Sequence, residues 1–194
     1  MMGYLYRNRG PNSFTFRLSY RRLELLKKFL NSKKYFKKTI KINWKKKHKN
    51  SIITNYSSSP FFHEHRTGLE NFYDNEWNLL LPMLEYSTKY ILEYLNISAK
   101  LIKSSDLKVT GKKSEYIKNL CLEVGAKTYL SGVYGKDYLN IEGFNNSKID
   151  VKFQNYIHPE YKQIHGNFEP NMSIIDLLFN CGSDSLSILG NSNK

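Results

Sequence analysis

The feature that most constrains the fold is an alternation of short strand-like and longer helix-like segments between residues 99 and 156. Strands are predicted at Ala99–Ser104, Lys127–Leu130 and Ile149–Tyr156, and helices at Ser114–Val124 and Gly135–Phe144. Strands that recur about every 25 residues with helices between them are typical of βαβ units. Right-handed crossovers would make the three strands neighbours in one largely parallel sheet. We therefore predict a three-layer α/β fold with helices flanking the sheet.

Two further segments have helical periodicity. From Leu69 to Leu95 apolar residues recur every three to four positions, which predicts a helix or a helix pair with Pro82 near the start of the second segment. Ser173–Cys181 is also predicted to be a helix, with Gly182 just past its end. Asp176 stands three residues after Ser173, and for this aspartate we favour a capping-box role over a functional one.

The positive charge of the chain is concentrated at its beginning. The formal net charge is +13, and residues 1–49 hold 16 of the 30 Lys and Arg but one of the 17 Asp and Glu. The remainder is close to neutral, so the excess belongs to an N-terminal arm and not to the predicted α/β domain. Within the arm, Met1–Thr15 shows no period and is predicted to be irregular, and Leu18–Leu30 is predicted to be a basic amphipathic helix.

Composition and length exclude several classes of protein. With 194 residues, 40% of them hydrophobic, the chain suits one domain with a substantial core and not a disordered protein. It contains no run of the ~18–20 apolar residues that a membrane-spanning helix requires, and no signal peptide is visible. Cys121 and Cys181 lie far apart in apolar helical patterns, which favours reduced thiols in a cytoplasmic protein.

The richest polar segment follows the third predicted strand. Ligands of parallel sheets bind beyond the carboxyl ends of strands, which here are Ser104-Ser105, Ser131-Gly132 and the stretch after Tyr156. After Tyr156 comes His158-Pro159-Glu160-Tyr161-Lys162-Gln163, with an imidazole, a phenol, a carboxylate and an amide. His158 could act as a general base or acid. The alternative is a turn histidine that hydrogen-bonds the backbone before Pro159.

The turn after the second strand contains two glycines. Ser131-Gly132-Val133-Tyr134-Gly135 could bring backbone amides close to a phosphate, although it lacks the features of a Walker or dinucleotide-binding motif. A tight turn that needs glycine for backbone reasons is an equally good interpretation. Tyr138, one turn further on, could face the same crevice or the core.

Two histidine-containing segments precede the predicted sheet segments. His63-Glu64-His65 has no evident third ligand, so we predict no metal site there. In Lys45-Lys46-Lys47-His48-Lys49 the lysines are expected to be solvated. Trp44 and His48 are one helical turn apart, and Ile52 follows at the next turn, so His48 is predicted to face the body of the protein, unlike the lysines around it.

These motifs, in this order and spacing, resemble the WbqC-like protein family, which is found in bacterial gene clusters for surface polysaccharides. The segments that carry the resemblance run from about Ile42 to Gly182 and are Trp44-Lys45-Lys46-Lys47-His48, Ser104-Ser105-Asp106-Leu107, Gly125-Ala126, Tyr129-Leu130-Ser131-Gly132, Gly135-Lys136-Asp137-Tyr138-Leu139, Val151 to Gln163 with His158-Pro159-Glu160-Tyr161, and Ser173-Ile174-Ile175-Asp176-Leu177-Leu178-Phe179-Asn180.

The beginning of the chain departs from the family pattern. Members of the family begin with a strand that leads into a His-Gln-Pro-x-Tyr-x-Pro-Trp motif, and nothing in Met1–Ile40 matches it. The resemblance therefore implies that the first βα unit is missing. We divide the chain into a divergent basic arm at residues 1–41 and a WbqC-like α/β domain at residues 42–194.

The resemblance implies work on surface glycans such as O-antigen or lipopolysaccharide. The implied reaction is acyl or aminoacyl transfer to a nucleotide-linked amino sugar, and the acyl donor, any cofactor and the oligomeric state stay open. His158, helped by Tyr161 and Gln163, would deprotonate or orient the sugar amine, and His48 would contribute from the other wall. The implied substrate-binding residues are Ser104, Ser131, Gly132 and Tyr138.

Two alternative functions remain open. One is a truncated, inactive remnant of such a protein. The other is a nucleic-acid-binding protein that uses the basic arm, which we disfavour because aromatic residues are not concentrated in the arm as stacking platforms.

Overall fold

A computed structural model of the chain describes residues 2–7, 14–18 and 44–191, with side chains for residues 44–190. The chain divides into two compact units, which we describe separately. The sheet unit comprises residues 1–33 and 98–155, and the helical unit comprises residues 34–97 and 156–194. Both units therefore combine segments from distant parts of the sequence. The predicted division at residue 41 stays a prediction.

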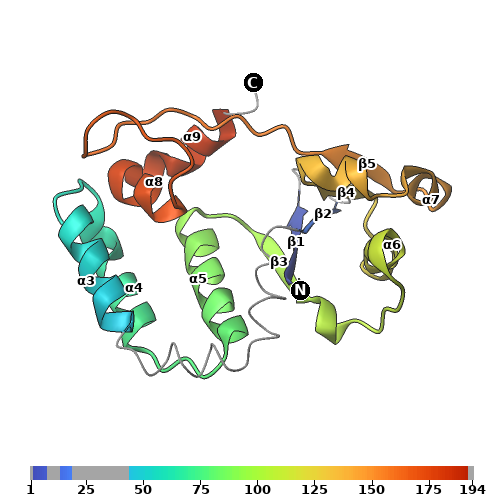
Figure 1. The fold of residues 1–194 in the computed structure, drawn as a ribbon, viewed down its shortest axis with the longest axis horizontal. Helices are drawn as coiled ribbons and strands as arrows, with labels where there is room; N and C mark the ends of the chain where they lie inside the picture. Colours follow the sequence, from blue (N-terminus) through green and yellow to red (C-terminus); the bar gives the residue numbers. More distant parts are fainter. Residues whose placement is uncertain (1, 8–13, 19–43, 192–194) are drawn as a thin grey trace. The chain divides into compact units, whose positions relative to one another are not determined.

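The sheet unit contains five described strands, in the order β3-β1-β2-β4-β5 (Figure 1). Their bounds are β1 Met2–Arg7, β2 Phe14–Leu18, β3 Ala99–Lys103, β4 Thr128–Ser131 and β5 Asp150–Phe153. β2, β4 and β5 pair in parallel, whereas β1 is antiparallel to both of its neighbours, β2 and β3. The α/β class is therefore confirmed, with a mixed sheet in which two of the four pairings are parallel and two are antiparallel.

The order of the strands corrects one prediction. The strands predicted from residue 99 onward are present, but β3 does not lie beside β4, because β1 and β2 lie between them. The prediction that Met1–Thr15 is irregular is also wrong at β1, which is hydrogen-bonded on both sides. The predicted helix Leu18–Leu30 lies outside the described residues apart from Leu18. The three-layer arrangement and the missing first βα unit stay predictions.

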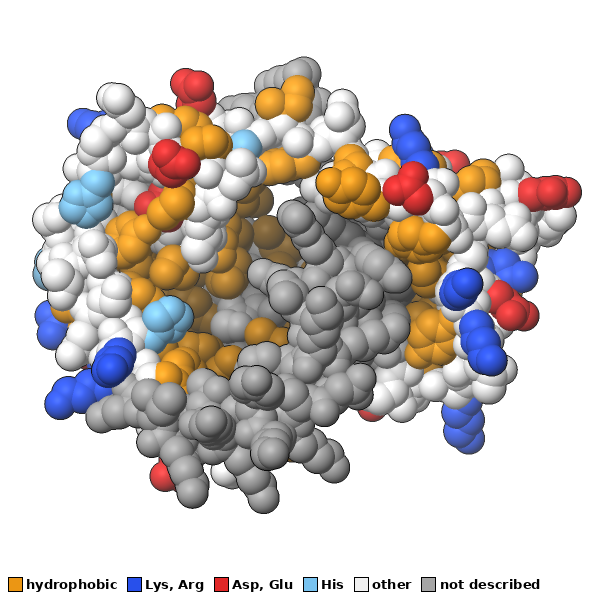
Figure 2. Space-filling view, in the orientation of Figure 1, with side chains coloured by type: hydrophobic (Ala, Val, Ile, Leu, Met, Phe, Trp, Pro, Cys, Tyr) orange, Lys and Arg blue, Asp and Glu red, His pale blue; other side chains and the backbone are white. Residues whose placement is uncertain are grey.

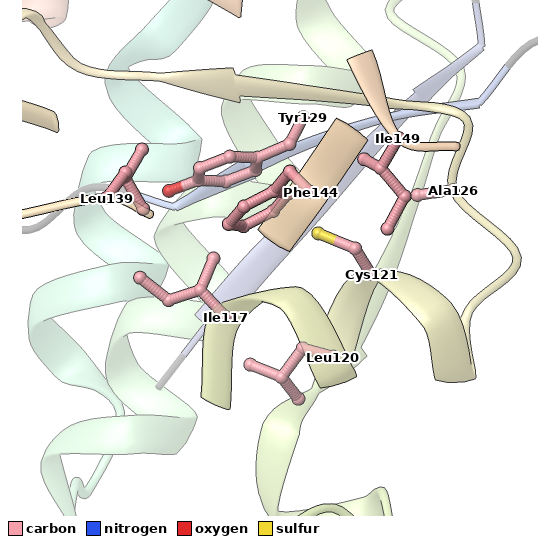
Figure 3. Close-up of a cluster of buried hydrophobic side chains, with 8 residues drawn as sticks. All are labelled: Ile117, Leu120, Cys121, Ala126, Tyr129, Leu139, Phe144 and Ile149. Atoms are coloured by element: carbon pink, nitrogen blue, oxygen red, sulfur yellow. The ribbon is translucent and has the colours of Figure 1, made fainter. Parts of the chain in front are cut away.

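The core of the sheet unit forms where two helices pack against β4. These helices are α6, Lys113–Glu123, and α7, Ile141–Asn146. In Figure 3 the rings of Tyr129 and Phe144 stack, with centroids 5.6 Å apart, and α6 contributes a row of apolar side chains beneath them. The row is Ile117, Leu120 and Cys121, whose three- and four-residue spacing places them on one helical face. Burial of each large apolar side chain contributes about 1.5–3 kcal/mol.

Gly125 ends the α6 segment, as predicted. Its φ of 67° lies in the left-handed region that glycine adopts without strain. The amide of Ala126 donates to the carbonyl of Cys121, and that of Gly125 donates to the carbonyl of Leu122, which is the pair of bonds of a Schellman motif. This turn leads the chain directly into β4.

The single helix predicted at Gly135–Phe144 is wrong. The structure has a short 3₁₀ helix, η2, at Val133–Asp137, and then α7. Asn140 separates the two, because its side-chain oxygen accepts a hydrogen bond from the amide of Gly143 at 3.1 Å and so begins a new helix.

The helical unit consists of α3 Trp44–Tyr56, α4 Phe62–Asp74, α5 Leu80–Tyr94, α8 Ile174–Cys181, η3 Gly182–Asp184 and α9 Ser185–Asn191. The predicted helix pair between Leu69 and Leu95 is confirmed by α4 and α5, with Pro82 in the first turn of α5. The core of this unit forms around Phe62 and Phe179, whose ring centroids are 5.4 Å apart. None of the helices described by the structure has the length and apolar character needed to cross a membrane.

Candidate functional site

Asp176 is the centre of a hydrogen-bonded network in the helical unit. It lies in the first turn of α8, and its side chain is buried. One carboxylate oxygen accepts a hydrogen bond from the hydroxyl of Tyr56 at 2.8 Å, and the other accepts from the hydroxyl of Tyr161 at 2.7 Å and from Nε2 of Gln163 at 2.9 Å. A buried carboxylate needs such donors, because an unpaired one would carry a large desolvation cost. The network ties α3, α8 and the segment after β5 together.

Gln163 fixes the loop that follows Tyr161. Its amide nitrogen, which donates to Asp176, also lies 3.1 Å from the carbonyl oxygen of Glu169, and its amide oxygen accepts from the backbone amide of Glu169 at 2.8 Å. Both ends of the side chain are therefore occupied. Gln163 acts in the structure as a brace between the loop and Asp176.

The two tyrosines of the network are held as hydrogen-bond donors. Burial, together with the neighbouring Asp176 carboxylate, raises the pKa of Tyr56 to about 12. Burial and the same carboxylate also raise the pKa of Tyr161 well above its ordinary value. An ionised phenol beside Asp176 would place two negative charges together, so both hydroxyls stay protonated near neutral pH.

The capping-box role that the sequence favoured for Asp176 is wrong. The Asp176 backbone amide donates to the carbonyl of Ser173, but no side-chain capping bond is present at this helix start. The carboxylate points instead to the tyrosines. A signal was present in the sequence, since Asp176 is the only charged residue among the apolar residues of α8, where an acid must find buried partners. Tyr56 was not among the residues predicted for the site, although it is a member of the network.

His158 lies in the irregular segment after β5, where the structure has no turn. Its Nδ1 is 2.9 Å from the carbonyl oxygen of Pro159, which can only accept, so Nδ1 carries the proton. In the neutral ring Nε2 then has the free lone pair, and within the described residues it makes no hydrogen bond. The ring also packs near three aromatic rings, with centroids 5.8–6.1 Å away, those of Tyr156, Tyr161 and Phe168. A hydrogen bond to the backbone at Nδ1 and a chemically available Nε2 thus occur in the same residue.

A pocket of about 280 Å³ adjoins His158 and Tyr161. Its lining is divided by chemistry. The polar part comes from Tyr156, His158 and Tyr161 together with Asn171 and Ser173, and the apolar part comes from Pro159, Met172, Ile174, Leu177 and Leu189. A small concave site with an apolar part and a few fixed polar groups is the usual form of a ligand pocket.

His48 lies elsewhere in the helical unit, on α3. Its side chain is exposed, and its Nδ1 is 2.7 Å from the hydroxyl oxygen of Tyr73 on α4. The rings of Trp44 and Tyr73 lie beside it, with centroids 6.3 and 5.7 Å away. The ring contacts Tyr73, but His48 is exposed like Lys46 and Lys47, so the expected contrast with the lysines around it is wrong. Among the described residues, no hydrogen bond or ring contact joins His48 to the Asp176 network.

The four predicted substrate-binding residues all belong to the sheet unit. Ser104 is buried at the end of β3, and Ser131 is buried at the end of β4. Gly132 has an extended backbone and open space around it, with a φ of −66°. Tyr138 packs against the core, which is one of the two positions expected for it. His158 belongs to the helical unit, so the crevice predicted between it and these four residues stays a prediction.

The packing around Gly135 explains why a glycine stands at this position after β4. A Cβ at this position would overlap Oγ of Ser131, because the serine packs directly on the glycine backbone. Close packing, rather than a positive φ, requires the small residue here. The glycine is thus required by packing and not by the backbone conformation that the turn interpretation gave as its reason.

The segment His63-Glu64-His65 lies on α4. His63 is exposed and His65 is buried, because residues two apart on a helix point to different sides. Within the described part of the chain, no three His, Cys, Asp or Glu side chains gather in a manner that could hold a metal ion.

An α/β protein with a sheet unit and a pocket-bearing helical unit is the class that these observations define. Within it, the sequence matches the WbqC-like protein family over residues 25–188, and the chain belongs to this family. It is also 34% identical over 145 residues to the uncharacterized protein Rv1507c of Mycobacterium tuberculosis. That match covers 74% of this chain and 63% of the relative, so the chain spans less than two thirds of the relative's length. No solved structure matches.

Proposed function

We propose that this WbqC-like protein acylates or aminoacylates the amine of a nucleotide-linked amino sugar in surface-glycan biosynthesis. The surface-glycan context is what the resemblance to the WbqC-like family implies. The observation that supports general-base catalysis is the hydrogen bond from Nδ1 of His158 to the carbonyl of Pro159. Because Nδ1 carries the proton, Nε2 of this pocket-lining residue is left as a proton acceptor.

In the proposed reaction His158 is the general base. The sugar amine attacks the acyl carbon, the new nitrogen–carbon bond forms, and the bond to the donor's leaving group breaks. The amine's proton passes to Nε2 of His158, which can return it to the leaving group. Tyr161, held by Asp176, would position the sugar from the neighbouring wall. The apolar side of the pocket, at Ile174 and Leu177, would exclude water from the reacting amine.

The size of the pocket suits one part of the substrate. At about 280 Å³ it lies just below the ~300–1,000 Å³ that drug-sized ligands occupy. It can hold a sugar ring or an acyl group, but not a whole nucleotide-linked sugar. The nucleotide would therefore lie outside it.

The test is turnover with a nucleotide-linked amino sugar by the His158→Ala variant. General-base removal is expected to lower the rate about 100-fold or more. His63→Ala is the matched control, since His63 is an exposed histidine on α4 outside the pocket, and it should leave turnover unchanged. Unchanged turnover by His158→Ala would rule out the proposed role.

A further inference from the structure

We propose that the pocket beside His158 binds the acyl group that is transferred, and that this group is a short uncharged alkanoyl group and not an aminoacyl group. The inference rests on the proposed function, since it chooses between the two classes of acyl group named there. The chemistry of the residues that line the pocket supports the choice.

The apolar wall of the pocket is part of the packed interior of the helical unit. Ile174 and Leu177 are three residues apart on α8, so they lie on one face of this helix. Leu177 is only 3% exposed, and Ile174 and Leu189 pack against the hydrophobic cluster that contains Phe179. Side chains held by such packing form a fixed surface for an alkyl chain.

Apolar surface continues to the mouth of the pocket. Met172 lines the pocket and is 43% exposed, and Tyr156, which also lines it, is 39% exposed. Figure 2 shows that hydrophobic side chains (orange) reach the surface of the helical unit, on the left of the view. Covering apolar surface with an alkyl group is favourable by about 25 cal/mol per Å².

An aminoacyl group would bring a protonated amine into this pocket. Among the described residues that line the pocket there is no Asp or Glu. Asp176 is not a lining residue, and its carboxylate already accepts hydrogen bonds from Tyr56, Tyr161 and Gln163. Glu160 is exposed and does not line the pocket. Moving an ammonium group out of water without a counter-charge is costly, so the pocket disfavours an aminoacyl group.

The polar side of the pocket suits an uncharged amide. In the proposed reaction Nε2 of His158 accepts the proton of the sugar amine, so it does not serve as the acceptor for a second amine. Asn171 and Ser173 bring neutral side chains that can donate to the acyl oxygen. The acyl carbonyl would thus lie on the polar side, with its alkyl chain against α8 and α9.

The experiment is calorimetric titration of the whole chain with two acylated sugars, N-propanoylglucosamine and N-glycylglucosamine. Their acyl groups have the same length, and the terminal methyl group of the first is replaced by a protonated amine in the second. Because the sugar is the same, the difference in affinity reports on the acyl group alone. The propanoyl sugar is expected to bind about tenfold or more tightly than the glycyl sugar.

Met172→Glu tests where the acyl group binds, because it places a carboxylate at the mouth of the pocket and leaves the buried wall unchanged. It should strengthen binding of the glycyl sugar about threefold, the effect of an exposed ion pair, and weaken binding of the propanoyl sugar. Leu186→Glu is the matched control, since Leu186 on α9 is 40% exposed and does not line the pocket. This control should keep the wild-type preference.

Equal affinity of the wild type for the two sugars, or a preference that Met172→Glu leaves unchanged, would overturn the inference. Absence of binding by both sugars would also overturn it. The turnover test of His158→Ala is independent of these titrations. Loss of turnover in that variant, together with equal affinity for the two sugars, would show that this inference fails while the proposed function holds.

Discussion

At the scale of single residues, Asp176 is the most informative position in the chain. Its carboxylate joins Tyr56, which is 120 residues away in sequence, to Tyr161 and Gln163. The sequence predicted Tyr161 and Gln163 because they lie close to His158 in one polar segment. It could not predict Tyr56, because only the fold brings the end of α3 to the start of α8.

Asp176→Asn tests this network. An amide has one acceptor oxygen and turns donor hydrogens toward a hydroxyl that also donates, so at least one buried donor loses its partner. The free energy of unfolding, from urea titration, should fall by about 2–4 kcal/mol. Asp184→Asn, an exposed aspartate of η3, is the control and should change it by less than about 0.5 kcal/mol. An Asp176→Asn protein as stable as the wild type would show that the three hydrogen bonds contribute little.

At the scale of secondary-structure elements, α4 shows how helix geometry gives neighbouring histidines different surroundings. His65 is buried, its Nδ1 lies 3.0 Å from the hydroxyl of Tyr90 on α5, and its ring centroid is 4.2 Å from that of Tyr94. Burial lowers the pKa of His65, although the charge of Glu64 and the carbonyl of Leu178 oppose this effect. The contact between α4 and α5 therefore depends on a neutral imidazole.

This contact predicts a pH dependence of stability. The pKa of His65 is lower in the folded chain than the ordinary 6.5 of the unfolded chain, so the unfolded chain binds more protons at mildly acidic pH. The stabilisation is present above about pH 6.5 and is lost as the pH falls below it toward the folded pKa. His65→Gln should flatten the dependence of unfolding free energy on pH between 7.5 and 5.5, by up to about 1.4 kcal/mol per pH unit. His63→Gln should keep the wild-type slope; an unchanged slope in His65→Gln would contradict the assignment.

At the scale of the whole molecule, local periodicity predicted the elements better than their arrangement. The helix α6 and the strands β3, β4 and β5 follow from apolar spacing and from Gly125. The insertion of β1 and β2 between β3 and β4 could not be predicted from spacing, because the pairing of strands distant in sequence depends on the whole sheet. The same limit applies to the site: His158 was found in a local motif, whereas its pocket is completed by α8 and α9.

The proposal that the sugar amine hydrogen-bonds to His158 in this pocket is tested most directly by histidine ¹⁵N spectra. The spectra are recorded during titration with a nucleotide-linked amino sugar. The His158 resonance, assigned by its loss in His158→Gln, should show the unprotonated Nε2 in the free protein. It should shift in a saturable manner as the amine hydrogen-bonds to this nitrogen. The buried His65 should not shift. A His158 resonance that stays unchanged at saturating sugar, or that shows the proton on Nε2 in the free protein, would contradict the account.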